Sequence, residues 1–123
     1  MTRSPDDLIP EAREKCLAWK SLCEKKGLRV KITETYRPQE RQDELFAQGR
    51  TAPGRIVTWT KASKHTLRRA FDFVVINEDG SLNWNEEMYK APAEVATICG
   101  LDAGYYWRKQ DCPHIQLFDK GVV

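Results

Sequence analysis

Several features are missing from this 123-residue chain, and each absence excludes a class of protein. No stretch approaches the roughly 20 consecutive apolar residues of a membrane-spanning helix, so membrane insertion is not expected. The first ten residues contain no apolar core of signal-peptide length, so we expect synthesis in the cytoplasm without an export signal. Twenty Lys and Arg residues against eighteen Asp and Glu residues leave a net charge of only +2. The basic residues are also scattered, which argues against nucleic-acid binding.

Closely spaced cysteine pairs are missing as well. The four cysteines, Cys16, Cys23, Cys99 and Cys112, contain no Cys-x-x-Cys spacing, which argues against a structural zinc site built from them. A cytoplasmic product keeps its thiols reduced. We therefore expect four free thiols in place of two disulfides.

The length and composition are those of one globular domain. Domains most often have roughly 100–150 residues, so residues 1–123 are expected to form a single domain. Hydrophobic residues make up 41% of the chain, enough for a core, which argues against disorder. No amphipathic segment is left over once this core is assigned, so we expect a monomer.

A long first helix is predicted from apolar periodicity. Leu8, Cys16, Trp19 and other apolar residues recur at helical spacing, which predicts a helix that starts with Ser4 as N-cap and runs to about Lys26. The apolar residues of this stripe are expected in the core.

A strand, a helix and a loop are predicted next. Residues 28–33 alternate between apolar and polar, as in a strand with one buried face. Residues 39–48 follow a proline and read as a second helix with Leu45 and Phe46 facing inward. Residues 50–62 read mainly as a loop, where functional groups are often displayed.

The second half contains the most hydrophobic segment, residues 70–76, which reads as a central strand followed by a turn at 77–80. Residues 85–99 have a helical pattern interrupted by a proline. Residues 103–107 and 114–118 read as two short strands that could pair with each other.

Three residues carry the strongest chemical signal. The chain has only two histidines, His65 and His114, and His65 precedes Asp72 in the central strand by seven residues. A carboxylate beside apolar strand neighbours costs several kcal/mol to bury alone, so it needs a cation, hydrogen-bond donors or a metal. Two imidazoles and one carboxylate would hold Zn²⁺ and leave a fourth position for water, the open arrangement of a catalytic site. The alternative is a surface histidine and a salt-bridged aspartate.

Two further groups could complete an amide-hydrolysing site. Asp111 and His114 can face each other only if the chain bends between them, and Pro113 favours such a bend. Asp111 is then a candidate general base for an attacking water. Arg37, near the end of the first strand, is a candidate for stabilising the oxyanion formed from the amide carbonyl.

The ordered motifs resemble those of the M15 family of zinc peptidases, which cut the peptides of bacterial cell wall. Within that family, the chain resembles the L-alanyl-D-glutamate endopeptidases, including phage endolysins, and more distantly the D-alanyl-D-alanine carboxypeptidases. Several ordered motifs over most of a chain are more specific than one short pattern. The matching motifs are Thr35-Tyr36-Arg37, Gln42-x-x-Leu45-x-Ala47-Gln48-Gly49-Arg50-Thr51-x-Pro53-Gly54-x-Ile56-Val57-Thr58, Ser63-x-His65-x-x-x-x-Ala70-x-Asp72 and Asp111-x-Pro113-His114.

The resemblance implies an α+β fold, with a small, largely antiparallel sheet and flanking helices, as in hedgehog and D,D-peptidase domains. It implies Zn²⁺ on His65, Asp72 and His114, Asp111 as base, and Arg37 at the carbonyl under attack. Substrate-binding residues would be Ser63, Gln42 and Trp107, with Ser63 bracing the His65 loop as the favoured alternative.

The function that the resemblance implies is hydrolysis of an amide in the peptidoglycan stem peptide, as a phage endolysin released through a holin to reach the wall. The alternatives are a D-alanyl-D-alanine carboxypeptidase and a non-catalytic wall-binding or virion module. Two departures bear on this choice. Arg68 stands where the family usually has glycine, and is expected to narrow the substrate groove or add a charge to it. Ala103-Gly104 stands where a Trp-Gly pair is usual, which alters the substrate-lining wall.

Overall fold

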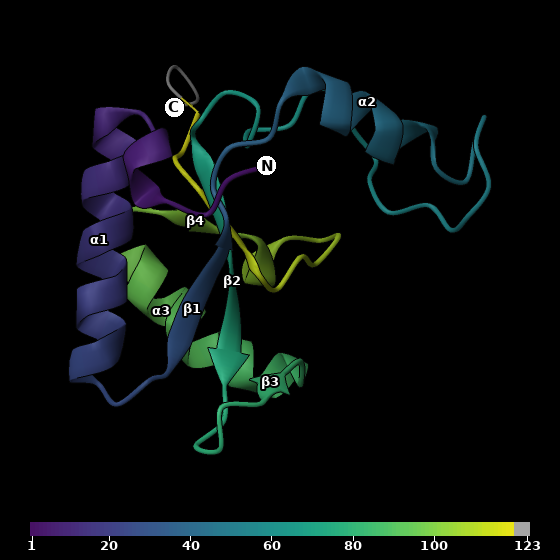
Figure 1. Ribbon diagram of the computed structural model, residues 1–123. Helices are drawn as coiled ribbons and strands as arrows, with labels where there is room; N and C mark the ends of the chain where they lie inside the picture. Colours follow the sequence, from purple (N-terminus) through teal and green to yellow (C-terminus); the bar gives the residue numbers. More distant parts are fainter. Residues whose placement is uncertain (120–123) are drawn as a thin grey trace.

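The computed structural model describes residues 1–119, which form a small sheet with α1 and α3 packed on one face (Figure 1). The α-helices are α1 (Pro10–Lys25), α2 (Gln39–Ala47) and α3 (Lys90–Ile98). The 3-10 helices are η1 (Pro5–Asp7), η2 (Glu86–Tyr89) and η3 (Gly104–Tyr106). The strands are β1 (Val30–Glu34), β2 (Ala70–Ile76), β3 (Leu82–Asn83), β4 (Asp102–Ala103) and β5 (His114–Gln116).

The sheet is antiparallel at every pairing. Its main path runs β1-β2-β5-β4, and β3 pairs with β2 as a short addition. The pairing of the two late strands, β4 and β5, is confirmed, and so is the α+β class with an antiparallel sheet. Among residues 1–119, no helix is long and apolar enough to cross a membrane.

The core lies between α1, α3 and the central strand β2. Trp19 of α1 packs against Phe71 and Phe73 of β2, with ring centroids 5.2 and 4.8 Å apart. Its indole N–H donates to the Pro92 carbonyl of α3 at 3.0 Å, so the largest buried side chain also satisfies its polar atom. Because side chains alternate along a strand, Asp72 between these two phenylalanines points to the opposite face.

The first helix starts later than the sequence pattern predicted. Ser4 caps only the 3-10 turn η1, accepting from the Asp6 backbone N–H at 3.2 Å, and the α-helix begins anew at Pro10. The predicted single helix from Ser4 is wrong because Pro10 restricts Ile9 to an extended conformation. Proline then suits the first helical position of α1.

The four cysteines are free, as predicted. Cys16 and Cys23 are fully buried on α1, and burial raises the pKa of each thiol to about 12. Both therefore remain protonated at neutral pH and act as small apolar groups in the core.

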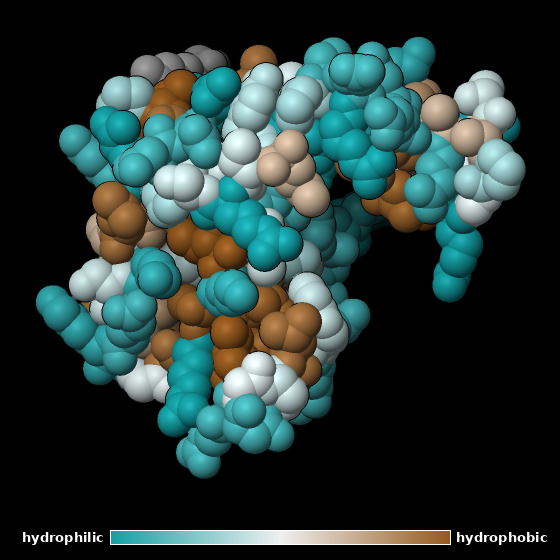
Figure 2. Space-filling view, in the orientation of Figure 1, coloured by the Kyte–Doolittle hydropathy of each residue, from teal (hydrophilic) through white to brown (hydrophobic). Residues whose placement is uncertain are grey.

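Two predicted elements differ from the structure. Residues 39–47 are helical as expected, but Leu45 and Phe46 are only half-buried, and Gln42 is the buried residue of α2. Residues 103–107 are not a strand, since β4 ends at Ala103 and a 3-10 turn follows. Helix α2 and the loop after it project from the sheet, and Figure 2 shows the surface hollowed beneath this arm.

Candidate metal and catalytic site

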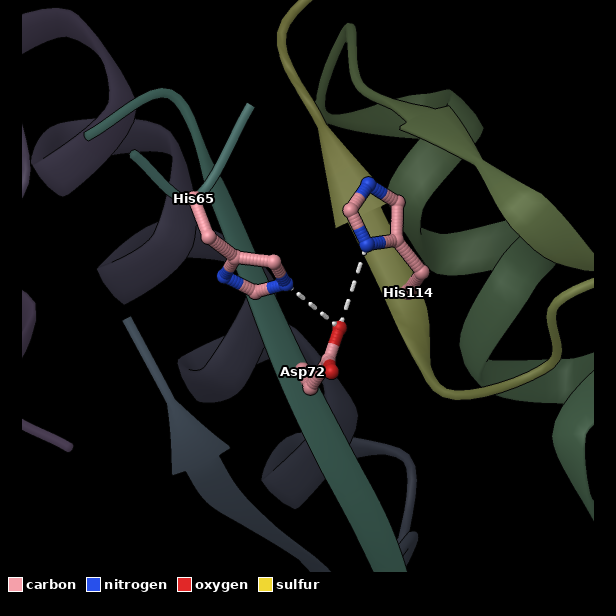
Figure 3. A group of neighbouring side chains, drawn as sticks. All are labelled: His65, Asp72 and His114. Atoms are coloured by element: carbon pink, nitrogen blue, oxygen red, sulfur yellow. Dashed lines mark hydrogen bonds and ion pairs between the residues drawn. The ribbon is translucent and has the colours of Figure 1, made fainter. Parts of the chain in front are cut away.

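The fold brings His65, Asp72 and His114 together at the sheet face opposite the helical core (Figure 3). Asp72 on β2 lies directly across from His114 at the start of β5. Directly opposed residues of an antiparallel pair share one face with neighbouring Cβ atoms, so the strand register alone places these two side chains together. His65 reaches them from the turn that precedes β2.

Asp72 Oδ1 lies at the centre of the group. It is 3.0 Å from His65 Nε2 and 3.2 Å from His114 Nδ1, and one ligand atom from each residue lies within 4.8 Å of the others. Burial alone would raise the pKa of Asp72, but hydrogen bonds from His114 and His65 and their charges outweigh it and hold that pKa well below its usual range. For His114 the signs are reversed. Burial lowers the pKa of this imidazole, but the hydrogen bond and the charge of Asp72 outweigh burial and raise its pKa overall.

Each imidazole is oriented by its second nitrogen. His65 Nδ1 donates to the Thr35 carbonyl at 3.3 Å, and His114 Nε2 donates to Gln116 Oε1 at 2.9 Å. Because both acceptors are carbonyl oxygens, the hydrogen must sit on these nitrogens. The nitrogens facing Asp72 therefore carry lone pairs when the rings are neutral, as in histidines that bind a metal.

These donors fit a zinc ion. Three electron-rich atoms facing one another favour a positive charge among them, either a proton or a metal ion. Ligand bonds of about 2.0–2.1 Å at tetrahedral angles place neighbouring donor atoms about 3.3 Å apart, close to the two separations seen here. Two imidazoles and a carboxylate also leave one coordination position open, as at catalytic zinc sites.

Arg37 is held by a buried network beside the site. Its Nε donates to Glu34 Oε2 at 2.8 Å and one terminal nitrogen contacts Glu34 Oε1. The other terminal nitrogen donates to Gln42 Oε1 at 2.7 Å, and Gln42 Nε2 donates to the Thr60 carbonyl at 2.6 Å. This network fixes the guanidinium plane in the wall of the cavity.

A cavity of about 500 Å³ connects these groups. Its lining contains all three candidate ligands together with Arg37, Asp111, Trp107 and Ser63. The Trp107 ring lies 5.2 Å from the His114 ring, and its Nε1 donates to Asp102 at 2.8 Å. Ser63 Oγ accepts from the His65 backbone N–H at 3.1 Å, which is the bracing role that the sequence favoured.

Gln42 does not line the cavity, although it was predicted to bind substrate. Its side chain is fully buried behind Arg37. Gln42 therefore orients Arg37 instead of touching a ligand. Glu34, which pairs with Arg37, was missed at the sequence level, because residues three apart in a straight strand point to opposite faces and the pair forms only through the bend after β1.

Arg68 also lies outside the cavity, which overturns the expectation that it narrows the groove. Its guanidinium stacks 3.9 Å from the centroid of the Tyr36 ring and donates to the Asp7 carbonyl at 3.1 Å. Its backbone has φ +59°, the left-handed conformation that glycine adopts most readily. The contacts of the side chain with Tyr36 and Asp7 offset that strain and hold it outside the cavity lining.

Asp111 is placed by a close backbone approach to Gly104. The Asp111 N–H donates to the Gly104 carbonyl at 2.9 Å, and the Asp111 carbonyl accepts from the His114 N–H at 3.1 Å. The chain thus turns between Asp111 and His114, as Pro113 predicted. Asp111 keeps solvent access, but burial raises the pKa of its carboxyl, opposed by the charge of His114 and reinforced by that of Asp72.

Gly104→Ala is expected to lower hydrolytic activity by about 100-fold, the cost typical of a 1 Å misplacement in an active site. A Cβ at this position would lie 2.3 Å from the Asp111 carbonyl oxygen, so the loop bearing Asp111 must move. Bound metal should remain, because the side chains of His65, Asp72 and His114 all lie outside the displaced segment 104–111. Gly80→Ala is the control, since it has positive φ but open space around its Cβ. Activity assays and metal analysis of both variants check this, and wild-type activity in Gly104→Ala would contradict it.

The stabilising effect of zinc is expected to grow between pH 6 and pH 8. In the metal-free protein the pKa of His114 is raised, so its contribution to stability is complete below the unfolded pKa of about 6.5 and is lost as pH rises through the folded pKa. Zinc instead binds more tightly as its ligands lose protons. Thermal unfolding with zinc or with a chelator checks this, and a Tm difference that narrows with pH would argue against a metal on His114.

Comparison with known proteins finds similarity both in sequence and in structure. No family model matches the chain. It is 34% identical over 125 residues to the peptidoglycan L-alanyl-D-glutamate endopeptidase CwlK of Bacillus subtilis (strain 168), an alignment that covers 92% of this chain and 75% of CwlK. The structure is similar to the L-Ala D-Glu endopeptidase ChiX of Serratia marcescens, with a TM-score of 0.72, 22% identity and coverage of 93% and 83%. It is also similar to the LD-carboxypeptidase LdcB, with a TM-score of 0.67, 18% identity and coverage of 93% and 60%.

Proposed function

The chain belongs to the M15 family of peptidases, and on this basis we propose that it is a zinc-dependent peptidoglycan peptidase that hydrolyses the L-alanyl-D-glutamate bond of the stem peptide. The observation that carries the proposal is the convergence of His65, Asp72 and His114 on one cavity that Arg37 and Asp111 also line. The named activity of CwlK, at 34% identity, supports the choice of bond. We propose that the chain acts as a one-domain monomer.

The metal would supply Lewis-acid chemistry. Zn²⁺ on His65, Asp72 and His114 would polarise an amide carbonyl and lower the pKa of a water bound to it. This chain's own residues would do the rest of the work, from the walls of the same cavity.

Asp111 would move the proton. Its raised pKa, caused by burial, suits a group that must accept a proton from the attacking water and later release it. After attack, Asp111 would pass that proton to the nitrogen of the leaving amine, so one carboxylate serves as base and then as acid.

Arg37 would stabilise the negative charge that develops on the carbonyl oxygen. Glu34 and Gln42 already hold its guanidinium in place, so little reorganisation is needed when the charge appears. Trp107, against the His114 ring, would form a rigid wall for the peptide.

Mass spectrometry of fragments released from purified peptidoglycan by the zinc-loaded protein tests the proposal. New peptides that start at D-glutamate would support it. Loss of a terminal D-alanine would instead assign a carboxypeptidase, and no released fragment from several wall types would favour a non-catalytic wall-binding module. Asp79→Asn, in the exposed turn after β2, is a matched control that should release the same fragments as wild type.

An endolysin role is a separate part of the proposal and rests on the motif resemblance alone. If the protein accumulates in the cytoplasm and reaches the wall through a holin, cells that express it should stay intact until a holin is co-expressed. Lysis without a holin would contradict this part without affecting the peptidase assignment.

A further inference from the structure

The catalytic cavity continues into a second one. This neighbouring cavity has a volume of about 490 Å³ and shares five lining residues with the first. The shared residues are Val57, Thr58, Thr60, Trp107 and Asp111. The two therefore form one groove between the loop after α2 and the segment that follows η3. The second cavity adds Trp59, Lys109 and Gln110 to the lining.

Lys109 differs from the other cations of this groove. Among residues 1–119, the lysine and arginine side chains that line the two cavities are Arg37, Lys64 and Lys109. Arg37 is paired with Glu34, and Lys64 lies 2.6 Å from Asp119. Lys109 has no carboxylate within ion-pair distance among residues 1–119, although Asp111 lies in the same cavity.

The Lys109 ammonium is positioned by an aromatic ring. Its Nζ lies 4.4 Å from the centroid of the Trp59 ring, and 66% of Trp59 is exposed. A cation on the face of a tryptophan is attracted by the ring quadrupole but keeps its hydrogen-bond donors free for another partner. Arg50 lies 5.9 Å from the same ring, but its guanidinium is engaged by the carbonyls of Phe46 and Thr58.

The substrate class named above has a group that fits this cation. A glutamate residue within a chain keeps one carboxylate free, whichever of its carboxyl groups continues the chain. In an alanyl-glutamate substrate this free carboxylate is adjacent to the bond being cut. Because Arg37 and Lys64 are already paired with carboxylates, Lys109 is the lysine of this groove whose charge can attract an anionic peptide.

We propose that Lys109, held on Trp59, is the specificity residue that binds the free carboxylate of an acidic residue beside the cleaved bond. This inference rests on the proposed peptidase function. The groove would then select substrates by charge. It would distinguish a glutamate at this position from the neutral amide analogue of the same size.

Two synthetic stem peptides test the proposal, one with the free glutamate carboxylate and one with that group as a carboxamide. Hydrogen bonds to charged groups contribute enough that wild type should favour the acid by about tenfold to hundredfold in kcat/KM, mainly through KM. Lys109→Met should remove this preference by raising KM for the acid, and Lys109→Arg should retain it. Lys61→Met is the matched control, since Lys61 lies over the Phe46 ring, 5.1 Å from its centroid, outside both cavities.

Equal preference in wild type and Lys109→Met would overturn the role of Lys109 while leaving the peptidase function intact. If wild type cut neither peptide, the proposed function would fail, and calorimetric binding of the two peptides would still decide the subsite. Tighter binding of the acid that is lost in Lys109→Met would support it, and equal binding of both peptides by both proteins would overturn it.

Discussion

Asp72→Asn is expected to abolish zinc binding and peptidase activity while leaving the metal-free protein folded. Asp72 Oδ1 lies within 3.2 Å of both imidazoles, so it supplies the one negative charge among the three ligands. Its loss should weaken zinc affinity by more than the roughly 10–100-fold seen when only an outer-sphere partner is removed.

In contrast to zinc affinity, the thermal stability of the metal-free protein should increase in Asp72→Asn at high pH. In the metal-free wild type, neutral imidazoles place the lone pair of each ring against the Asp72 carboxylate. An asparagine can turn its amide nitrogen toward them and donate, because His65 and His114 already direct their own N–H groups to Thr35 and Gln116. Metal-free Asp72→Asn should therefore unfold at a higher Tm than metal-free wild type at pH 8.

Calorimetric zinc titration and thermal unfolding of the chelated proteins measure both effects. Asp79→Asn is the matched control, because it makes the same substitution in the turn beyond the other end of β2 and should bind zinc as wild type does. Undiminished zinc affinity in Asp72→Asn would show that the metal, if bound, is held elsewhere.

The convergence of His65, Asp72 and His114 could be predicted from sequence because its physical causes are local. A carboxylate in the middle of the apolar strand 70–76 has few ways to be satisfied, and only two histidines were available to satisfy it. Pairing of β2 with β5 then places Asp72 opposite His114 without any further assumption. The apolar segment 70–76 and its pairing with β5 thus account for the central strand, the antiparallel pairing and the position of the site.

The first helix was mispredicted because two signals competed. Apolar periodicity continues through residues 8–23, but Pro10 forces an extended residue before it. Periodicity reports which face is buried and does not report where the backbone breaks. The conformation of residues 8–10 was decided by the proline, as its fixed φ would indicate.

The roles of Gln42 and Arg68 depended on tertiary contacts that spacing does not encode. A glutamine on a helix next to a site can face the ligand or lie behind a neighbouring side chain. Gln42 is fully buried between Arg37 and the Thr60 carbonyl, so it lies behind Arg37. Arg68 has the left-handed backbone that suits a glycine, but its side chain contacts Tyr36 and does not enter the groove.

Asp111→Asn is expected to reduce kcat by about 10²–10⁴-fold, the typical contribution of a general acid or base, with little change in zinc affinity. Asparagine has nearly the same shape as aspartate, so the backbone contacts with Gly104 and His114 that place the residue can form unchanged. The amide cannot accept a proton from water or return one to the leaving amine. Because Asp111 is not among the three converging ligand groups, metal binding and catalysis separate in this variant, whereas Asp72→Asn loses both.

The pH profile gives this prediction its sharpest check. Burial raises the pKa of Asp111, so the wild-type rate should fall on the acid side at a higher pH than an ordinary aspartate would cause. That acid limb should be absent from the residual activity of Asp111→Asn, since the titrating base is gone. Asp79→Asn should keep both the rate and the limb. Two results would contradict the prediction: wild-type kcat in Asp111→Asn, or a loss of activity caused only by loss of zinc. Another group would then have to move the proton. The raised pKa of Asp111 would in that case reflect its position at the cavity and not a catalytic role.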